Sequence, residues 1–307
     1  MNRRDFLRNT ALGASALTLS PNLLFSASKT HQLTILHTND MHSRIEPFPM
    51  NAKRSPGMGG MARRASLIDQ IRAEGNEVLL LDAGDIFQGT PYFNFFGGEL
   101  EFKLMSQMGY DAATMGNHDF DAGLSGFVKQ LPLANFQFVN ANYTFEEDVL
   151  KKSVKPYKIF KKGKVTVGVF GLGIELESLV PKDLYGNTKY ADPIGVAKEI
   201  VSELKAKKCD LIICLSHLGN KYKVDKVSDE ILAQSVDGID LIIGGHTHTF
   251  LTSPQEYQTP NGSKVLVNQV GWAGINLGRI DYFFNNDLSD KKAESSVIGI
   301  RGNQSNF

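Results

Sequence analysis

The 307-residue sequence predicts a layered α/β protein. Two observations lead to this prediction. Short apolar runs, several of them rich in β-branched residues, alternate with segments of helical periodicity, and the chain contains no internal repeat. The composition, with 42% hydrophobic and 21% charged residues, is sufficient for a large buried core.

The predicted strands are short and are bounded by glycine or polar residues. They cover 33–37, 78–82, 112–115, 138–141, 165–170, 211–216, 241–243, 265–269 and 277–284. Helices are predicted around 61–71 and 194–204, where apolar residues recur on one face. Asp192 and Pro193 are residue types that cap and begin helices, so they predict the start of the second helix.

The two ends of the chain differ from the rest. Arg3 and Arg4 precede a mildly apolar stretch over 11–25, which is typical of a twin-arginine export signal. We therefore expect residues 1–28 to be a signal peptide and the mature protein to be exported to the periplasm or the extracellular medium. Small and polar residues interrupt the stretch, which argues against a stable membrane span. Polar residues over 286–307 predict a C-terminal tail, which leaves 29–285 as one domain.

Charge and cysteine content exclude some classes of protein. Lysine plus arginine equals aspartate plus glutamate at 33 each, so no global basic excess indicates a nucleic-acid polymer as partner. Cys209 and Cys214 lie in one predicted extended segment, where their Cα atoms would be about 16 Å apart. A disulfide needs a separation below about 7 Å, so we expect two buried strand residues without a disulfide.

Metal-binding residue types follow five of the apolar runs. They occur in HTNDMH, DAGD, GNHDFD, the single His217 and HTH. Taken singly, each has an ordinary structural explanation, such as a turn cap or a hydrogen-bonded core group. Taken together, they sit where loops beyond the carboxyl ends of strands converge on a ligand. Carboxylate oxygen and imidazole nitrogen without thiolate suit zinc, manganese or iron, so we expect a site for two divalent ions.

The same series, D-x-H, GDxxxG, GNHD, H and GHTH, resembles the calcineurin-like metallophosphoesterase superfamily. Longer segments are similar to the catalytic domain of the 5'-nucleotidase family, namely HTNDMHSRIEP, GGMARRASLIDQIR, LDAGDIFQGTPYF, GYDAATMGNHDFDAG and VNQVGWAGINLGRIDYFF. The resemblance makes 29–285 the metallophosphoesterase catalytic domain. It implies a four-layer sandwich in which two mixed β-sheets are flanked by helices.

The resemblance also implies a role for each site residue. Three ligands would hold one metal ion, three would hold the other, and one carboxylate would bridge them; these are Asp40, His42 and His248, then Asn117, His217 and His246, and finally Asp85. His118, oriented by Asp121, would assist the leaving group while a metal-bridging hydroxide attacks phosphorus. Asn117 would also contact the phosphoryl group, and Arg44 is a weaker candidate for contact with the substrate anion.

The implied activity is hydrolysis of phosphate monoesters, with a nucleotide as the expected substrate. Two alternatives stay open: a related hydrolase of cyclic nucleotides, nucleotide sugars or sulfur esters, and a non-catalytic periplasmic metal-binding subunit. The presence of both His118 and Asp121 counts against the second. Two-domain nucleotidases carry a C-terminal domain that binds the base. This sequence stops before such a domain, so a separately encoded one is an expected partner.

Overall fold

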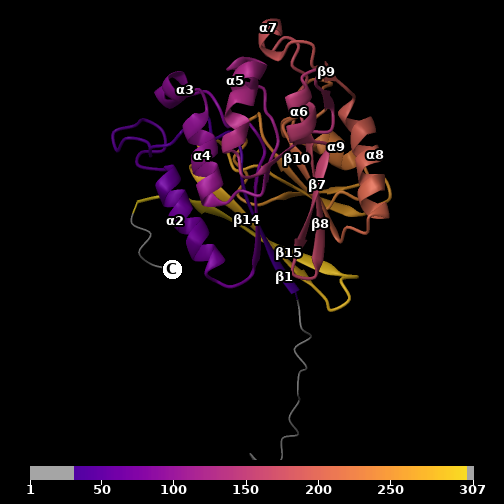
Figure 1. Ribbon diagram of the computed structural model, residues 1–307. Coiled ribbons are helices and arrows are strands. Elements are labelled where there is room, and N and C mark those ends of the chain that lie inside the picture. The colour runs from indigo at the N-terminus through magenta and orange to yellow at the C-terminus, as the bar shows by residue number, and fades with distance from the viewer. Residues whose placement is uncertain (1–30, 303–307) are drawn as a thin grey trace, which may run out of the picture. The chain divides into compact units, whose positions relative to one another are not determined.

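The computed structural model describes residues 31–302, in which two mixed β-sheets pack between layers of helices (Figure 1). The predicted signal peptide, residues 1–28, lies outside the described residues. All nine predicted strands occur within them. The two predicted helices occur as well, and Asp192 caps the second by accepting hydrogen bonds from the N–H groups of Ile194 and Gly195.

The first sheet has seven strands and is mixed. In spatial order they are β15 (Lys291–Gly299), β14 (Asn276–Phe284), β1 (His31–Thr38), β2 (Glu77–Asp82), β3 (Ala112–Ala113), β4 (Gln137–Val139) and β6 (Val154–Lys155). Strand β14 runs antiparallel to both of its neighbours, whereas the other strands of this sheet apart from β15, namely β1, β2, β3, β4 and β6, are parallel to one another. The carboxyl ends of the parallel strands therefore meet at one edge of the sheet.

The second sheet has six strands and is also mixed. In spatial order they are β12 (Gln255–Gln258), β13 (Lys264–Asn268), β11 (Leu241–Gly244), β10 (Leu211–Ser216), β8 (Val165–Leu172) and β7 (Tyr157–Lys162). The central four are parallel, and the two edge strands are antiparallel to their neighbours. A separate short pair joins β5 (Tyr143–Thr144) to β9 (Lys189–Tyr190).

Helices cover the outer faces of both sheets (Figure 1). On the first sheet lie α2 (Met61–Arg72), α4 (Glu99–Met108) and α5 (Gly123–Gln130), which share its hydrophobic cluster. On the second lie α8 (Pro193–Ala206) and α9 (Asp229–Ser235). The remaining short helices lie in connecting segments: α3 (Pro91–Phe96), the 3₁₀ turns η1 (His118–Phe120) and η2 (Leu131–Leu133), α6 (Asp148–Ser153) and α7 (Lys182–Tyr185).

The alternation of side chains along the strands produces three apolar layers. In β2, Leu79 and Leu81 point into a cluster between the two sheets, whereas Leu80 points toward the helices. In β10, Ile213 points between the sheets and Cys214 points toward α8 and α9. Strands buried on both faces read as continuous apolar runs for this reason. The predicted four-layer sandwich is confirmed.

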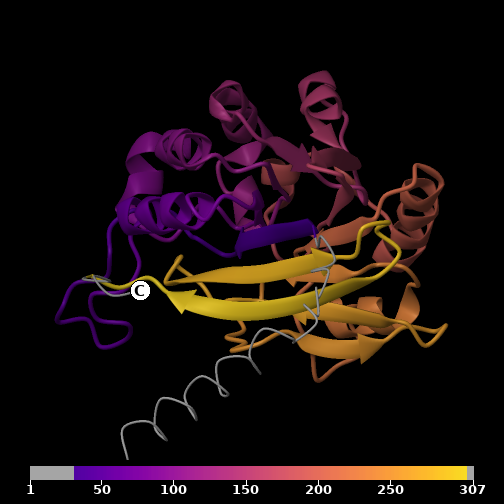
Figure 2. The same cartoon turned by 90° about the horizontal axis from the view of Figure 1, so that it is seen from below.

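The predicted C-terminal tail is wrong. Residues 291–299 form β15, which pairs with β14 from Asn276 opposite Gly299 to Phe284 opposite Lys291. Figure 2 shows the two long strands side by side. The segment is polar because β15 is an edge strand whose residues are mostly solvent-accessible, with few apolar contacts, such as those of Ala293 and Ile298. The apolar run that marks a central strand is therefore missing.

Two further expectations concern the cysteines and the membrane. Both thiols are free; Cys214 is buried in β10, but Cys209 lies before that strand and is partly exposed. Within residues 31–302, no helix is both long enough and apolar enough to cross a membrane.

Candidate metal centre

All seven predicted ligands follow the carboxyl ends of parallel strands. Residues from the first sheet are Asp40 and His42 after β1, Asp85 after β2 and Asn117 after β3; those from the second are His217 after β10, and His246 and His248 after β11. The ligands therefore come from both sheets and meet at the edge where the two sets of strands end. The convergence expected from the sequence is present.

The side chains form two groups of potential ligand atoms that share one carboxylate. The first consists of Asp40, His42, Asp85 and His248, and the second of Asp85, His217 and His246. Within each group, the ligand atoms all lie within 4.8 Å of one another. Asp85 belongs to both groups, which is the arrangement that a bridging carboxylate requires.

In the first group, imidazole nitrogens and carboxylate oxygens face one another closely. The Nε2 atoms of His42 and His248 are 2.9 Å apart, and Nε2 of His248 is 3.4 Å from Oδ1 of Asp40. Two ligand atoms bound at right angles to one ion with bonds of about 2.1 Å lie about 3 Å apart. The spacing of this group therefore fits a shared divalent cation.

The second group is similarly spaced. Nε2 of His217 lies 3.1 Å from Oδ2 of Asp85. Asn117 adjoins this group, because its Oδ1 lies 2.8 Å from Nδ1 of His246. Nε2 of His217 is fully buried and faces the carboxylates of Asp85 and Asp40, without regular hydrogen-bond geometry to either. A buried nitrogen without a hydrogen bond is costly unless it has another partner, so this atom also fits a metal ligand.

Backbone carbonyls orient two of the imidazoles. Nδ1 of His217 lies 2.6 Å from the carbonyl oxygen of Ala83, and Nδ1 of His42 lies 3.1 Å from that of Gln88. A nitrogen this close to a carbonyl oxygen donates to it, so Nδ1 carries a proton and Nε2 is the nitrogen that remains for the cluster. In both residues Nε2 is therefore the atom that would bind a metal ion.

The charges at the site favour a cation. Burial opposes ionisation of Asp85, but His217 and His42 hold its pKa well below the ordinary range. Burial lowers the pKa of His246 to about 3, which keeps that imidazole neutral. For His217, the carboxylates of Asp85 and Asp40 outweigh burial and raise the pKa to about 10. The ionised carboxylates attract positive charge; a protonated His217 balances part of it, and a metal ion that binds there would displace that proton.

The ligand loops adopt an unusual backbone. Asp40, His42, Asp85, His246 and His248 have φ angles of 50°, 48°, 54°, 70° and 51°. This left-handed region costs an L-residue roughly 1–2 kcal/mol, and such conformations persist only where the surroundings enforce them. The folded structure therefore imposes the ligand geometry at a cost in stability.

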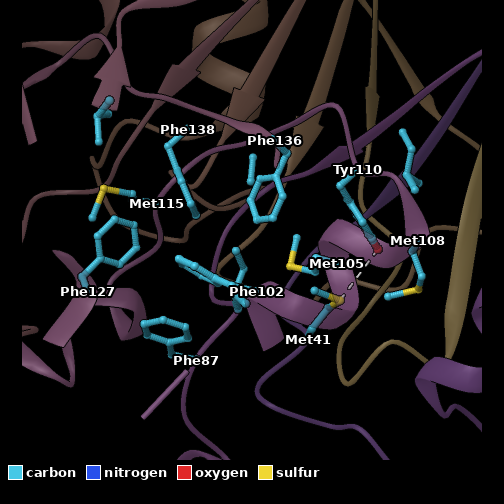
Figure 3. Packing of buried hydrophobic residues seen from close by; sticks show 14 of the residues in the cluster. Met41, Phe87, Phe102, Met105, Met108, Tyr110, Met115, Phe127, Phe136 and Phe138 are labelled. Atoms are coloured by element: carbon cyan, nitrogen blue, oxygen red, sulfur yellow. Dashed lines mark hydrogen bonds between the residues drawn. The ribbon is translucent and has the colours of Figure 1, made fainter. Parts of the chain in front are cut away.

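Apolar residues inside the loops supply part of that enforcement. Met41 lies between two of the predicted ligands in sequence, Phe87 follows Asp85, and Met115 precedes Asn117; all three are fully buried. Figure 3 shows them in the cluster between the first sheet and its helices, with Tyr110 in contact with the sulfur of Met41. Each loop therefore places polar residues in the site and an apolar residue in the core.

Sequence reasoning did not identify Asp119 as part of the site. Its buried carboxylate accepts hydrogen bonds from the backbone N–H groups of Asp85, Ile86, Phe87 and Gly116, at 2.8–3.2 Å. Burial and the nearby Asp85 raise the pKa of Asp119 to about 7, against the effect of these donors. Asp119 holds the β2 and β3 loops together, and its place inside the GNHD motif was the available signal.

His118 and Asp121 form a pair beside the cluster. Nδ1 of His118 lies 2.8 Å from Oδ2 of Asp121, and the His118 N–H donates to Oδ1 of Asp85 at 2.8 Å. The hydrogen bond that His118 donates to Asp121 is the main cause of a raised His118 pKa. The His118 side chain is 41% exposed, so a substrate can reach it. A raised pKa and an accessible imidazole beside the ligand cluster are what a proton donor requires.

Arg44 is not one of the residues of the cluster. Its guanidinium lies over the Phe48 ring, 4.2 Å from the centroid. The ring of Phe48 in turn contacts Trp272, which stacks on His248 at an interplanar angle of 12°. Arg44 is thus connected to His248, a potential ligand, only through the rings of Phe48 and Trp272.

Comparisons with known proteins identify the family of this chain. The family model for calcineurin-like phosphoesterases matches residues 33–250. A snake venom 5'-nucleotidase from Gloydius brevicauda is 33% identical, over 90% of this chain and 49% of that protein. A 5'-nucleotidase from Vibrio cholerae is 36% identical, over 87% and 51%. A 5'-nucleotidase precursor from Thermus thermophilus superposes with a TM-score of 0.77 at 33% identity, over 87% of this chain and 55% of that one.

The chain spans about half the length of the curated relatives it matches. The family match covers most of the described residues and includes all of the predicted ligands. This chain belongs to the calcineurin-like phosphoesterase family of metal-dependent hydrolases.

Proposed function

We propose that this chain hydrolyses phosphate monoesters at a site for two divalent ions, with nucleoside 5'-monophosphates as the substrate class. The observation that carries the proposal is Asp85, which is shared by both groups of ligand atoms and accepts the N–H of His118. One carboxylate thus links two cation sites to an accessible proton donor. The names of the relatives support the choice of nucleotide substrates.

The proposed ligands divide into two sets around Asp85. Asp40, His42 and His248 would hold one ion, and Asn117, His217 and His246 the other. Two such ions, when bound, lower the pKa of a water molecule and neutralise charge on phosphoryl oxygens. The donor set of carboxylate, amide and imidazole groups fits zinc, manganese or iron.

The remaining chemistry belongs to side chains of this chain. With Nδ1 of His118 bonded to Asp121, the second proton of the imidazolium is on Nε2, where it can pass to the departing alkoxide. Asn117, whose Oδ1 faces His246, would direct its amide N–H groups toward a phosphoryl oxygen. Arg44 is a weaker candidate for substrate contact, because its guanidinium is already stacked on Phe48.

A direct assay tests the proposal. Purified protein supplied with Mn²⁺ or Zn²⁺ is offered AMP, p-nitrophenyl phosphate and bis(p-nitrophenyl) phosphate. Turnover of the monoesters, with AMP preferred, is the expected result. Faster turnover of the bis-ester would instead favour a diesterase. Absence of turnover despite bound metal would favour the non-catalytic metal-binding subunit.

The matched variant His118→Ala separates catalysis from metal binding. It should lower kcat by roughly 10²- to 10⁴-fold, the usual contribution of a general acid. Metal content should stay at the wild-type value, because His118 lies outside both ligand groups. Loss of metal in this variant would refute the proposed division of roles.

Two proposals concern the surroundings of the enzyme. A separately encoded substrate domain would bind the base, and a tagged chain should then co-purify from its host with a partner that raises kcat/KM for AMP. Full AMP activity of the isolated monomer would reject this partner.

Export of the chain is the second of these proposals. Export through the twin-arginine route would be lost when Arg3 and Arg4 are both replaced by lysine, and unchanged secretion would reject that route.

A further inference from the structure

Gln269 lies directly after β13 and is fully buried. Strand β13 is the parallel neighbour of β11, and the loop after β11 contains His246 and His248. Gln269 therefore lies beside the backbone of the loop that carries two of the proposed ligands. Its place in the VNQVGW segment had suggested no role.

The side-chain amide of Gln269 uses both of its ends on this loop. Nε2 donates to the carbonyl oxygen of Gly245 at 2.6 Å. Oε1 accepts from the hydroxyl of Thr247 at 3.1 Å and from the N–H of Thr249. The backbone carbonyl of Gln269 also accepts from the N–H of Leu251 at 3.1 Å. Gln269 therefore contacts every second residue from 245 to 251.

The residues between these contacts are the two histidines. Both have a left-handed backbone, with φ angles of 70° and 51°. Such residues return to right-handed or extended conformations when nothing holds their neighbours, and the side chain then points elsewhere. Because Gln269 holds residues 245, 247 and 249, the imidazoles of His246 and His248 stay directed at the cluster.

We propose that Gln269 is a positioning residue that sets both imidazoles at once and thereby couples the affinities of the two metal sites. The inference rests on the proposed function, in which His246 and His248 serve different ions. An amide side chain suits this task because the carbonyl oxygen of Gly245 needs a hydrogen-bond donor, whereas the Thr247 hydroxyl and the Thr249 N–H need an acceptor. No direct contact of Gln269 with metal or substrate is involved.

The test measures the two Mn²⁺ affinities of metal-free protein by isothermal titration calorimetry, with Mn²⁺ as the only ligand. Gln269→Met keeps the length of the side chain and introduces no charge, but removes the donor and the acceptor. Gln137→Met is the matched control, because the Gln137 amide also bonds backbone carbonyls, those of Phe138 and Ser153, at 2.9 and 2.6 Å, but lies in β4 outside the ligand loops.

The expected result is a parallel loss at both sites. Gln269→Met should weaken each of the two affinities by roughly 10- to 100-fold, the usual effect of residues that orient metal ligands. Gln137→Met should leave both affinities unchanged. His246→Ala and His248→Ala should each weaken mainly one site, which distinguishes a shared positioning residue from an individual ligand.

Several outcomes would overturn the inference. Wild-type affinities in Gln269→Met, or loss at one site only, would contradict coupled positioning. If circular dichroism shows that Gln269→Met does not fold, Thr247→Val is used instead, because it removes the hydrogen bond from the Thr247 hydroxyl to Gln269. Unchanged Mn²⁺ affinities in Thr247→Val would also overturn the inference. Wild-type protein that binds two ions without hydrolysing any phosphate ester would reject the proposed function and leave this inference in place. Binding of fewer than two ions by the wild type would refute both.

Discussion

Asp85 is the residue on which the two halves of the proposed centre depend. Replacing it by Asn keeps the shape but removes the charge that both groups share, so we expect metal content to fall from two ions to one or fewer. Substitution of residues that only hydrogen-bond to metal ligands already lowers metal affinity or activity 10- to 100-fold. Substitution of the bridging carboxylate itself should therefore lower hydrolysis by more than about 10²-fold. Metal analysis after dialysis and the AMP assay measure both effects.

A second aspartate provides the control for this substitution. Asp111 pairs with Lys162 at 3.1 Å and takes no part in either ligand group. Asp111→Asn should therefore retain both ions and full activity. Retention of two ions by Asp85→Asn would contradict the bridging role.

His118 should give the activity an alkaline limit. Its pKa is raised, mainly by the hydrogen bond that it donates to Asp121, and a general acid acts in its protonated form. Activity should therefore be present below this raised pKa and be lost as the pH rises through it. In Asp121→Asn the main cause of the raised pKa is removed, so the alkaline limb of kcat/KM against pH should move to lower pH.

The acid limb serves as the internal reference for that measurement. It depends on protonation of ligands and of the phosphate itself, neither of which Asp121 contacts directly. An alkaline limb that stays in place in Asp121→Asn would mean that another group titrates there.

At the scale of elements, helix α8 offers a test of stability separate from activity. Asp192 accepts from the N–H of Gly195 at 2.8 Å and caps the helix, which packs on the outer face of the second sheet. Asp192→Ala should lower the free energy of unfolding by about 1 kcal/mol, the usual value of such a cap. Urea unfolding measures this loss, and kcat should be unchanged.

Asn also caps helices well, so Asp192→Asn should retain most of the stability. An equal loss in both variants would show that the charge of Asp192, and not its capping hydrogen bonds, matters.

The elements that could be predicted from the sequence are those with continuous apolar runs. Central strands such as β2 and β10 are buried on both faces and were recognisable for that reason. The longer strands that were not predicted, β7, β12 and β15, are all edges of their sheets. An edge strand buries fewer side chains, so its sequence resembles a polar loop.

The same distinction applies to the site. The residues of the cluster could be found from the sequence because metal-binding residue types directly follow five apolar runs. Asp119 and Gln269 could not, because their function depends on backbone groups from loops that are distant in sequence. Residue type and spacing contain no information on which backbone groups will be neighbours.

At the scale of the whole molecule, the proposed metal centre joins the two sheets. Asp40 and Asp85 follow strands of the first sheet, and His217 and His246 follow strands of the second. Direct contacts already cross between them, since the N–H of His246 donates to Oδ1 of Asp40 at 2.9 Å. Ions bound at this position would add further links between the sheets that are absent from the unfolded chain.

Metal binding should therefore stabilise the entire fold. A single ion that binds only the folded state contributes about 4 kcal/mol when its concentration is 1,000 times the dissociation constant. For a domain of this size that corresponds to a rise in Tm of roughly 10 °C, measurable by scanning calorimetry with EDTA or with Mn²⁺. The rise should shrink as the pH falls, because the imidazoles must lose their protons to bind metal. Asp85→Asn should abolish most of the rise, whereas Asp192→Ala should lower Tm in both conditions and leave the difference intact. Equal Tm values with EDTA and Mn²⁺ in the wild type would contradict a metal centre that joins the two sheets.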